Sequence, residues 1–157
     1  MTAGRGAQAA PVVLASQQGI APRLRRGAGS REATMAREGF IDVPGARLWF
    51  WDAEGDGAPV LLCHPASQGA EIWTHQMQAL ASAGFRPLAY ARRGHAPTVT
   101  TDARQAGTQV GDLLAVLDAL GIAQAHLVGA AAGGGVAMRF VAAHGARVRS
   151  LVLAGSI

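Results

Sequence analysis

Apolar residues follow two patterns that alternate along the chain from about residue 40 onward. Short, nearly continuous apolar runs predict strands buried on both faces, and apolar residues spaced three or four apart predict amphipathic helices. Glycine ends all three helical segments, at Gly84, Gly121 and Gly145, as is usual at a helix C-terminus. The predicted strands cover 46–52, 59–64, 85–90, 125–128 and 148–154, and the predicted helices cover 71–83, 104–120 and 134–144.

This alternation of strands and helices predicts the fold class. Right-handed strand–helix–strand crossovers build a mostly parallel sheet with helices on both faces, so we expect an α/β protein. Ligand sites in such sheets form at the carboxyl ends of the strands. The loops that follow residues 64, 90 and 128 are therefore the places to look for chemistry.

The first 34 residues show neither pattern. They consist largely of Gly, Ala, Gln, Ser and Arg without a sustained period, which is typical of disorder. Met35 stands just before the periodic sequence and would make an ordinary bacterial start. We therefore expect residues 1–34 to be a disordered leader or an over-extended start, and residues 35–157 to form the domain.

Composition excludes several classes of protein. The net charge of +4 comes from the leader, because residues 38–157 hold eight Arg against nine acids, and nothing there predicts nucleic-acid binding. No apolar run reaches 18 residues, so no membrane span or membrane partner is expected. The single Cys63 excludes an internal disulfide and fits a cytoplasmic protein. Absence of Lys together with abundant Ala and Gly suggests a GC-rich bacterial source.

The run HLVGAAAGGGVAMRF, residues 126–140, joins a predicted strand to a predicted helix through tiny residues. A phosphate-binding P-loop would need a Lys after Gly134, and the chain contains none. A dinucleotide-binding turn would need a second Gly at Ala131 and a later acid, and no acid follows Asp118. The remaining candidate is a nucleophile elbow, G-x-S-x-G, in which Gly129 and Gly133 have the required spacing.

Five landmarks in register now give the chain a family resemblance. From Gly39 to its end, the chain resembles the amino-terminal portion of an α/β-hydrolase fold protein. The landmarks are the oxyanion loop at 64–66 (HPA), the first-helix motif at 73–76 (WTHQ), the loop at 90–95 (YARRGH), the helix motif at 112–114 (DLL) and the strand at 148–155 (VRSLVLAG). The resemblance implies an incomplete α/β-hydrolase fold.

The resemblance also assigns roles to individual positions. It places Ala131 in the nucleophile slot, with Gly129, Gly133 and Gly134 as the elbow glycines. It implies that the main-chain N–H groups of Ala66 and Ala132 form the oxyanion hole, and that His64 and His95 order the loops. The sequence departs from the family pattern at Pro65, Ala91, Ala96 and Ala131.

No catalytic residue can be identified in the chain. The family places its acid and base after the nucleophile, but no acid follows Ala131 and the only later histidine is His144, near a helix end. Ser67 lies beside the oxyanion loop without a recognisable base, and Cys63 sits in an apolar strand that would make its thiol unreactive. No metal site is expected, because no His, Asp or Glu pair has ligand spacing, and no cofactor is expected either.

Three functional hypotheses follow. In the first, the chain is a fragment of an ester, amide or C–N hydrolase and is inactive because nucleophile, acid and base are all absent, a pseudoenzyme. In the second, residues beyond 157 activate water, as in relatives resembling aminoacrylate or carbamate hydrolases. In the third, the fold serves as a non-catalytic binding module. The expected partner is a small molecule, and the apolar last strand predicts self-association unless residues 1–34 or a partner cover it.

Overall fold

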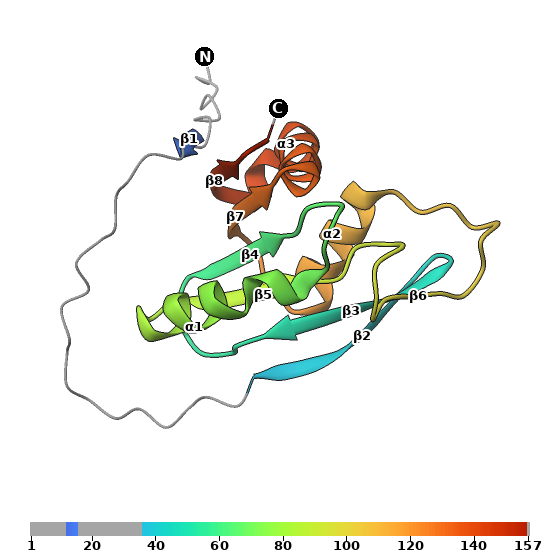
Figure 1. Ribbon diagram of the computed structural model, residues 1–157, viewed down its shortest axis with the longest axis horizontal. Helices are drawn as coiled ribbons and strands as arrows, with labels where there is room; N and C mark the ends of the chain where they lie inside the picture. The colour runs from blue at the N-terminus through green and yellow to red at the C-terminus, as the bar shows by residue number, and fades with distance from the viewer. Residues whose placement is uncertain (1–11, 16–35, 157) are drawn as a thin grey trace, which may run out of the picture.

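The computed structural model describes residues 12–15 and 36–156, which form one mixed β-sheet with helices on both faces (Figure 1). The strands run in the order β1-β8-β7-β4-β5-β3-β2, and β6 pairs with β3. Their bounds are β1 (Val12–Ala15), β2 (Arg37–Val43), β3 (Ala46–Asp52), β4 (Pro59–Cys63), β5 (Arg86–Tyr90), β6 (Val99–Thr100), β7 (Ala125–Ala130) and β8 (Val148–Ala154). The helices are η1 (Ala70–Trp73), α1 (Thr74–Ser82), α2 (Gln109–Ala119), α3 (Ala132–His144) and η2 (Gly145–Arg147), of which η1 and η2 are short 3₁₀ turns.

Most of the sheet is parallel. Strands β4, β5, β7 and β8 pair in parallel, while β2 and β3 form an antiparallel hairpin that joins the sheet through β5. The hairpin turns at Pro44-Gly45, where Gly45 has a φ of +73° that a side chain would disfavour. The expected α/β class with a mostly parallel sheet is confirmed.

Successive side chains of the central strands enter two separate cores. In β4, Leu61 and Cys63 belong to the core that α2 and α3 cover, while Val60 and Leu62 belong to the core under α1 (Figure 1). This division follows from the period of two along a strand. It explains why these strands read as continuous apolar runs rather than as alternating ones.

The predicted helix at 104–120 is shorter in the structure. Helix α2 begins at Gln109, because the Thr108 hydroxyl accepts a hydrogen bond from the Gly111 N–H at 3.0 Å and caps the helix there. Residues just before it are held instead by Asp102, whose carboxylate accepts from the Arg104 N–H. Conversely, α3 begins at Ala132, earlier than the predicted residue 134.

Three strands, β1, β2 and β6, were not among the predicted elements. Strand β1 lies inside the segment expected to be disordered, so that expectation does not hold for Val12–Ala15. It pairs in parallel with β8, from Val12 opposite Leu151 to Ala15 opposite Ala154. Residues 12–15 thus lie on the strand edge for which the sequence predicts self-association, and the rest of 1–34 is outside the described residues.

A buried ion pair joins the antiparallel and parallel parts of the sheet. The Arg86 Nε and Nη2 donate to the two carboxylate oxygens of Asp52, at 3.0 and 2.6 Å, and Asp52 is fully buried. Asp52 also accepts from the Glu54 N–H at 2.8 Å, so its carboxylate is well satisfied. Removing Arg86 would leave the buried Asp52 charge without a compensating cation, so the pair stabilises the contact between β3 and β5.

Within the described residues, none of the helices has the length and apolar character needed to cross a bilayer.

Candidate functional site

The site begins at the turn from β7 into α3. Ala131 has φ +46° and ψ −115°, a conformation that residues with a side chain rarely adopt. Its N–H donates to the Ala154 carbonyl at 3.0 Å, and its own carbonyl accepts from the Gly134 N–H at 3.0 Å. The backbone therefore has the sharp strand-to-helix geometry that presents one side chain at the top of the sheet, and here that side chain is a methyl group.

The glycines around Ala131 are required by close backbone contacts. A Cβ on Gly129 would overlap the Gly134 Cα, and a Cβ on Gly133 would overlap the Cys63 carbonyl. A Cβ on Gly134 would overlap the Ser156 side chain. By contrast, a Cβ on Gly135 would meet only the flexible end of Arg139, at 3.6 Å. The first three glycines let helix and strands approach, and the fourth is not needed for packing.

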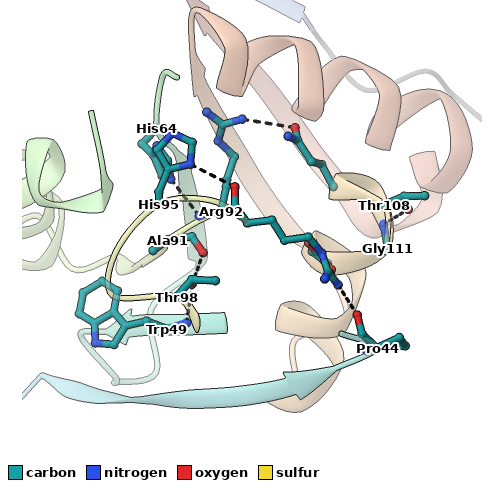
Figure 2. Close-up of polar contacts among 12 residues, drawn as sticks. Pro44, Trp49, His64, Ala91, Arg92, His95, Thr98, Thr108 and Gly111 are labelled. Atoms are coloured by element: carbon teal, nitrogen blue, oxygen red, sulfur yellow. Dashed lines mark hydrogen bonds and ion pairs between the residues drawn. The ribbon is translucent and has the colours of Figure 1, made fainter. Parts of the chain in front are cut away.

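His64 is buried beneath this turn and links two loops. Its Nε2 accepts a hydrogen bond from the Arg92 main-chain N–H at 2.9 Å (Figure 2). The neutral ring therefore carries its proton on Nδ1, which donates to the Pro65 carbonyl at 2.7 Å. Burial lowers the pKa of His64 from its ordinary value of 6.5, and the Pro65 hydrogen bond offsets this only in part. Both ring nitrogens are therefore occupied, and neither is placed to serve as a base.

His95 reaches the same region from the loop after β5. Its Nε2 contacts the Ala66 carbonyl at 2.9 Å, and its ring meets that of His64 edge-on, with centroids 4.6 Å apart. The two histidines thus connect residues 64–66 with residues 92–95. These contacts support the expectation that His64 and His95 order the two loops.

Two further groups hold the loop that follows β5. The Thr98 hydroxyl donates to the Ala91 carbonyl at 2.6 Å and accepts from the Trp49 N–H at 2.9 Å (Figure 2). Arg93 donates through Nε and Nη2 to both carboxylate oxygens of Asp112, at 2.8 and 2.9 Å, and also through Nη2 to the Pro44 carbonyl. The loop is tied in this way to β3 and to α2.

A pocket of about 620 Å³ opens at the carboxyl ends of the central strands. It brings together Ala66, Ala131 and Ala132, the three positions that the resemblance assigns to the oxyanion hole and the nucleophile slot. Its volume suits a small molecule. Its full lining is Ala66, Arg92, Gln109, Ala131, Ala132, Gly135, Arg139 and Gly155.

None of the alternative nucleophiles or bases is suitably placed. Burial raises the pKa of the Cys63 thiol to about 12, so this thiol is not ionised near neutral pH. The His144 ring packs on Phe140, with centroids 5.0 Å apart, at the far end of α3 from the elbow. Ser67 is exposed, and the structure describes no hydrogen bond from its hydroxyl to a base.

Within 12–15 and 36–156, no three His, Cys, Asp or Glu side chains gather as metal ligands.

Sequence reasoning did not identify the polar residues of the pocket, Arg92, Gln109 and Arg139. Arg92 lies two residues after the end of β5, and the position before it is Ala91, where the family pattern has Asp. The missing acidic residue at position 91 is the one signal in the sequence, and it does not distinguish Arg92 from the adjacent Arg93.

Comparison with known proteins places this geometry in a family. The family model described as alpha/beta hydrolase fold matches residues 58–157. The chain therefore belongs to the α/β-hydrolase fold family, as the order of its strands and the turn at Ala131 also indicate.

Two curated relatives illustrate the range of activities in the family. A non-heme chloroperoxidase of Kitasatospora aureofaciens is 36% identical over 110 residues, which are 69% of this chain and 40% of the relative. A protein of Variovorax paradoxus named "Putative carbamate hydrolase RutD" is 37% identical over 100 residues, 62% of this chain and 38% of the relative. The chain thus spans about two fifths of the length of these relatives.

Solved structures show the same partial coverage. A carboxylesterase of Nitrososphaera gargenis matches with a TM-score of 0.69 and 28% identity, over 76% of this chain and 46% of that one. An epoxide hydrolase from Vigna radiata matches with a TM-score of 0.69 and 26% identity, over 78% of this chain and 40% of that one.

Proposed function

We propose that this chain supplies the oxyanion-binding half of a hydrolase site and carries out no covalent catalysis itself. The observation that carries the proposal is Ala131, whose methyl group occupies the position and the strained backbone that a nucleophile elbow provides. A methyl group cannot attack a carbonyl carbon, so no acyl-enzyme forms there. The chain then acts as a binding site for a small molecule, as expected for an inactive, pseudoenzyme-like fragment.

The surrounding residues support this proposal. Ala66 and Ala132 line the same pocket as Ala131, which supports the role that the family resemblance gives to their main-chain N–H groups, stabilising a carbonyl oxygen. The nearest potential substitutes are unsuitable, because burial keeps Cys63 protonated and both nitrogens of His64 are engaged. The oxyanion part of the site is retained while the nucleophilic part is absent.

Covalent labelling tests this proposal. The purified 157-residue chain is treated with a fluorophosphonate, which reacts with activated serines, and its intact mass is measured. We expect no adduct under conditions that fully label an active serine hydrolase. A stable adduct on the wild-type chain that disappears in Ser67→Ala would show that Ser67 is an activated nucleophile and would overturn the proposal.

A second function is favoured by the similarity to the carbamate-hydrolase relative. In this alternative, an acid and a histidine beyond residue 157 activate water, and the site at Ala66 and Ala132 stabilises the developing oxyanion without a covalent intermediate. The test is carbamate hydrolysis by the product of the complete natural reading frame. Turnover without a pre-steady-state burst supports this alternative, and binding without turnover supports the binding module.

A further inference from the structure

Arg92 is a buried cation that has no acidic partner among the residues that the structure describes. The residue is 3% exposed, and its one described side-chain hydrogen bond is a long one, from Nη1 to the Gln109 Oε1 at 3.3 Å. Its Nε and Nη2 have no acceptor within the part of the chain that the structure describes. Gln109 is neutral, so no carboxylate there compensates the guanidinium charge. A buried charge left unpaired is strongly unfavourable, so this arrangement calls for an explanation.

Two other arginines in the same domain show what the unpartnered edge of Arg92 is suited to bind. Arg86 donates hydrogen bonds through its Nε and Nη2 to the carboxylate of Asp52, and Arg93 does the same to the carboxylate of Asp112. That edge of the guanidinium presents two parallel N–H groups, which match the two oxygens of a carboxylate. In Arg92 the same pair of nitrogens is the pair without an acceptor.

The pocket around Arg92 is electrostatically suited to an anion. None of its lining residues is acidic, and a second arginine, Arg139, stands in its wall. Helix α3 begins at Ala132 in the same wall, and the first N–H groups of a helix, with the positive end of its dipole, favour negative charge. Two cations and a helix N-terminus therefore surround one cavity.

We propose that this pocket binds a small carboxylate, with its carboxyl group on the Nε and Nη2 edge of Arg92 and the rest of the molecule at Ala131. Because Nε and Nη2 are buried in the pocket wall in the structure, this binding requires a rotation of the terminal torsions of Arg92 that brings their edge to the cavity. The inference rests on the proposed function, because it uses the same pocket, and it adds the chemical class of the molecule. A phosphate offers similar oxygens, but the planar pair in a carboxylate is the partner that Arg86 and Arg93 already take.

Binding of pyruvate to the full 157-residue chain tests the inference. Sodium pyruvate is titrated by calorimetry, with the neutral pyruvamide as the matched ligand and inorganic phosphate as the alternative anion. We expect pyruvate to bind and pyruvamide to bind at least about tenfold more weakly, because a charge-assisted bidentate pair is lost. Phosphate is expected to bind more weakly than pyruvate, and the reverse order would overturn the assignment to a carboxylate.

Variants identify the residue responsible. Arg92→Gln is expected to weaken pyruvate binding at least about tenfold. Arg92→Lys is expected to weaken it several-fold, because lysine keeps the charge but lacks the two parallel N–H groups of the guanidinium. Arg139→Gln, at an exposed position where folding is not at risk, is also expected to weaken binding several-fold. The control is Arg149→Gln, at an exposed position on β8 outside the pocket, which is expected to bind like the wild type.

Failure of this inference can be told apart from failure of the proposed function. Thermal unfolding first establishes which variants are folded. Unchanged pyruvate binding in folded Arg92→Lys and Arg139→Gln would overturn the carboxylate site while leaving the absence of covalent catalysis intact. Arginine-dependent pyruvate binding in a chain that also labels with fluorophosphonate would overturn the proposed function and leave the carboxylate site standing.

Discussion

The Nε2 of His64 accepts a hydrogen bond from the main-chain N–H of Arg92 at 2.9 Å, between the loops that follow β4 and β5. A proton on Nε2 would destroy this contact, because both groups would then be donors. The neutral ring is therefore part of the folded structure. Arg92 also lines the pocket, so protonation of His64 would disturb the pocket as well.

The depressed pKa of His64 predicts a loss of stability in mild acid. Burial lowers its pKa in the folded state below the ordinary value of 6.5, so between the two pKa values the unfolded chain binds more protons. The stability is thus fully present above 6.5 and declines as pH falls toward the folded pKa. Urea unfolding between about pH 7.5 and about pH 5 should show this decline.

A variant isolates the contribution of His64. In His64→Gln, the Gln Oε1 can accept from the Arg92 N–H but does not titrate, so the acid-dependent loss should be smaller than in the wild type. His126 also has a lowered pKa, through burial first and Arg149 second, so His126→Gln serves as the parallel measurement. An equal decline in the wild type and in His64→Gln would contradict the prediction.

Alanine substitutions at two glycines in the first turn of α3, Gly133 and Gly135, should change the unfolding free energy in opposite directions. Gly133→Ala places a methyl group against the Cys63 main-chain carbonyl, which cannot move aside, and should cost about 3 kcal/mol of unfolding free energy. Gly135→Ala meets only the end of Arg139 and should stabilise the helix by about 0.5–1 kcal/mol. Urea unfolding measures both, and similar effects from the two substitutions would refute the close contact.

The backbone of Ala131 predicts that glycine is more stable there. A residue with a side chain at φ +46° carries strain of about 1–3 kcal/mol, against about 0.4–1 kcal/mol for the greater freedom of glycine in the unfolded chain. Ala131→Gly should therefore raise the unfolding free energy by about 1 kcal/mol. The control, Ala143→Gly at an exposed position of α3, should lower it by about 1 kcal/mol. A loss of stability in both variants would show that Ala131 is not strained.

The sequence predicted the centre of the sheet because the strands there are buried on both faces. The runs at 59–64 and 85–90 match β4 and β5, in which every residue after the first is buried, since continuous apolar residues leave little choice of environment. The missed strands lack this signal: every residue of β2 is exposed or only partly buried, and both residues of β6 are exposed. Their pairing is decided by contact with β3, which no local pattern encodes.

The candidate site was predictable in its backbone but not in its charges. Tiny residues at 129–135 indicate a close turn wherever they occur, so Gly129, Ala131 and Gly133 could be placed from spacing. Arg92 could not, because Arg92 and Arg93 are adjacent and identical in type. Only the structure shows that Arg93 pairs with Asp112 while Arg92 is buried with no carboxylate partner in 12–15 or 36–156. Which arginine is available depends on the position of α2, and that is a long-range property.

Pairing of β1 with β8 predicts the association state of the chain. The parallel ladder from Val12–Leu151 to Ala15–Ala154 occupies an edge that would otherwise expose main-chain donors and acceptors to another copy. Val13→Pro removes a main-chain N–H and disfavours pairing, whereas Val13→Ala keeps it. Sedimentation velocity over a range of concentrations should show more self-association for Val13→Pro than for Val13→Ala or the wild type. Equal, concentration-independent sedimentation of all three would mean that β1 does not protect this edge, and residues 12–15 would then have no part in keeping copies of the chain apart.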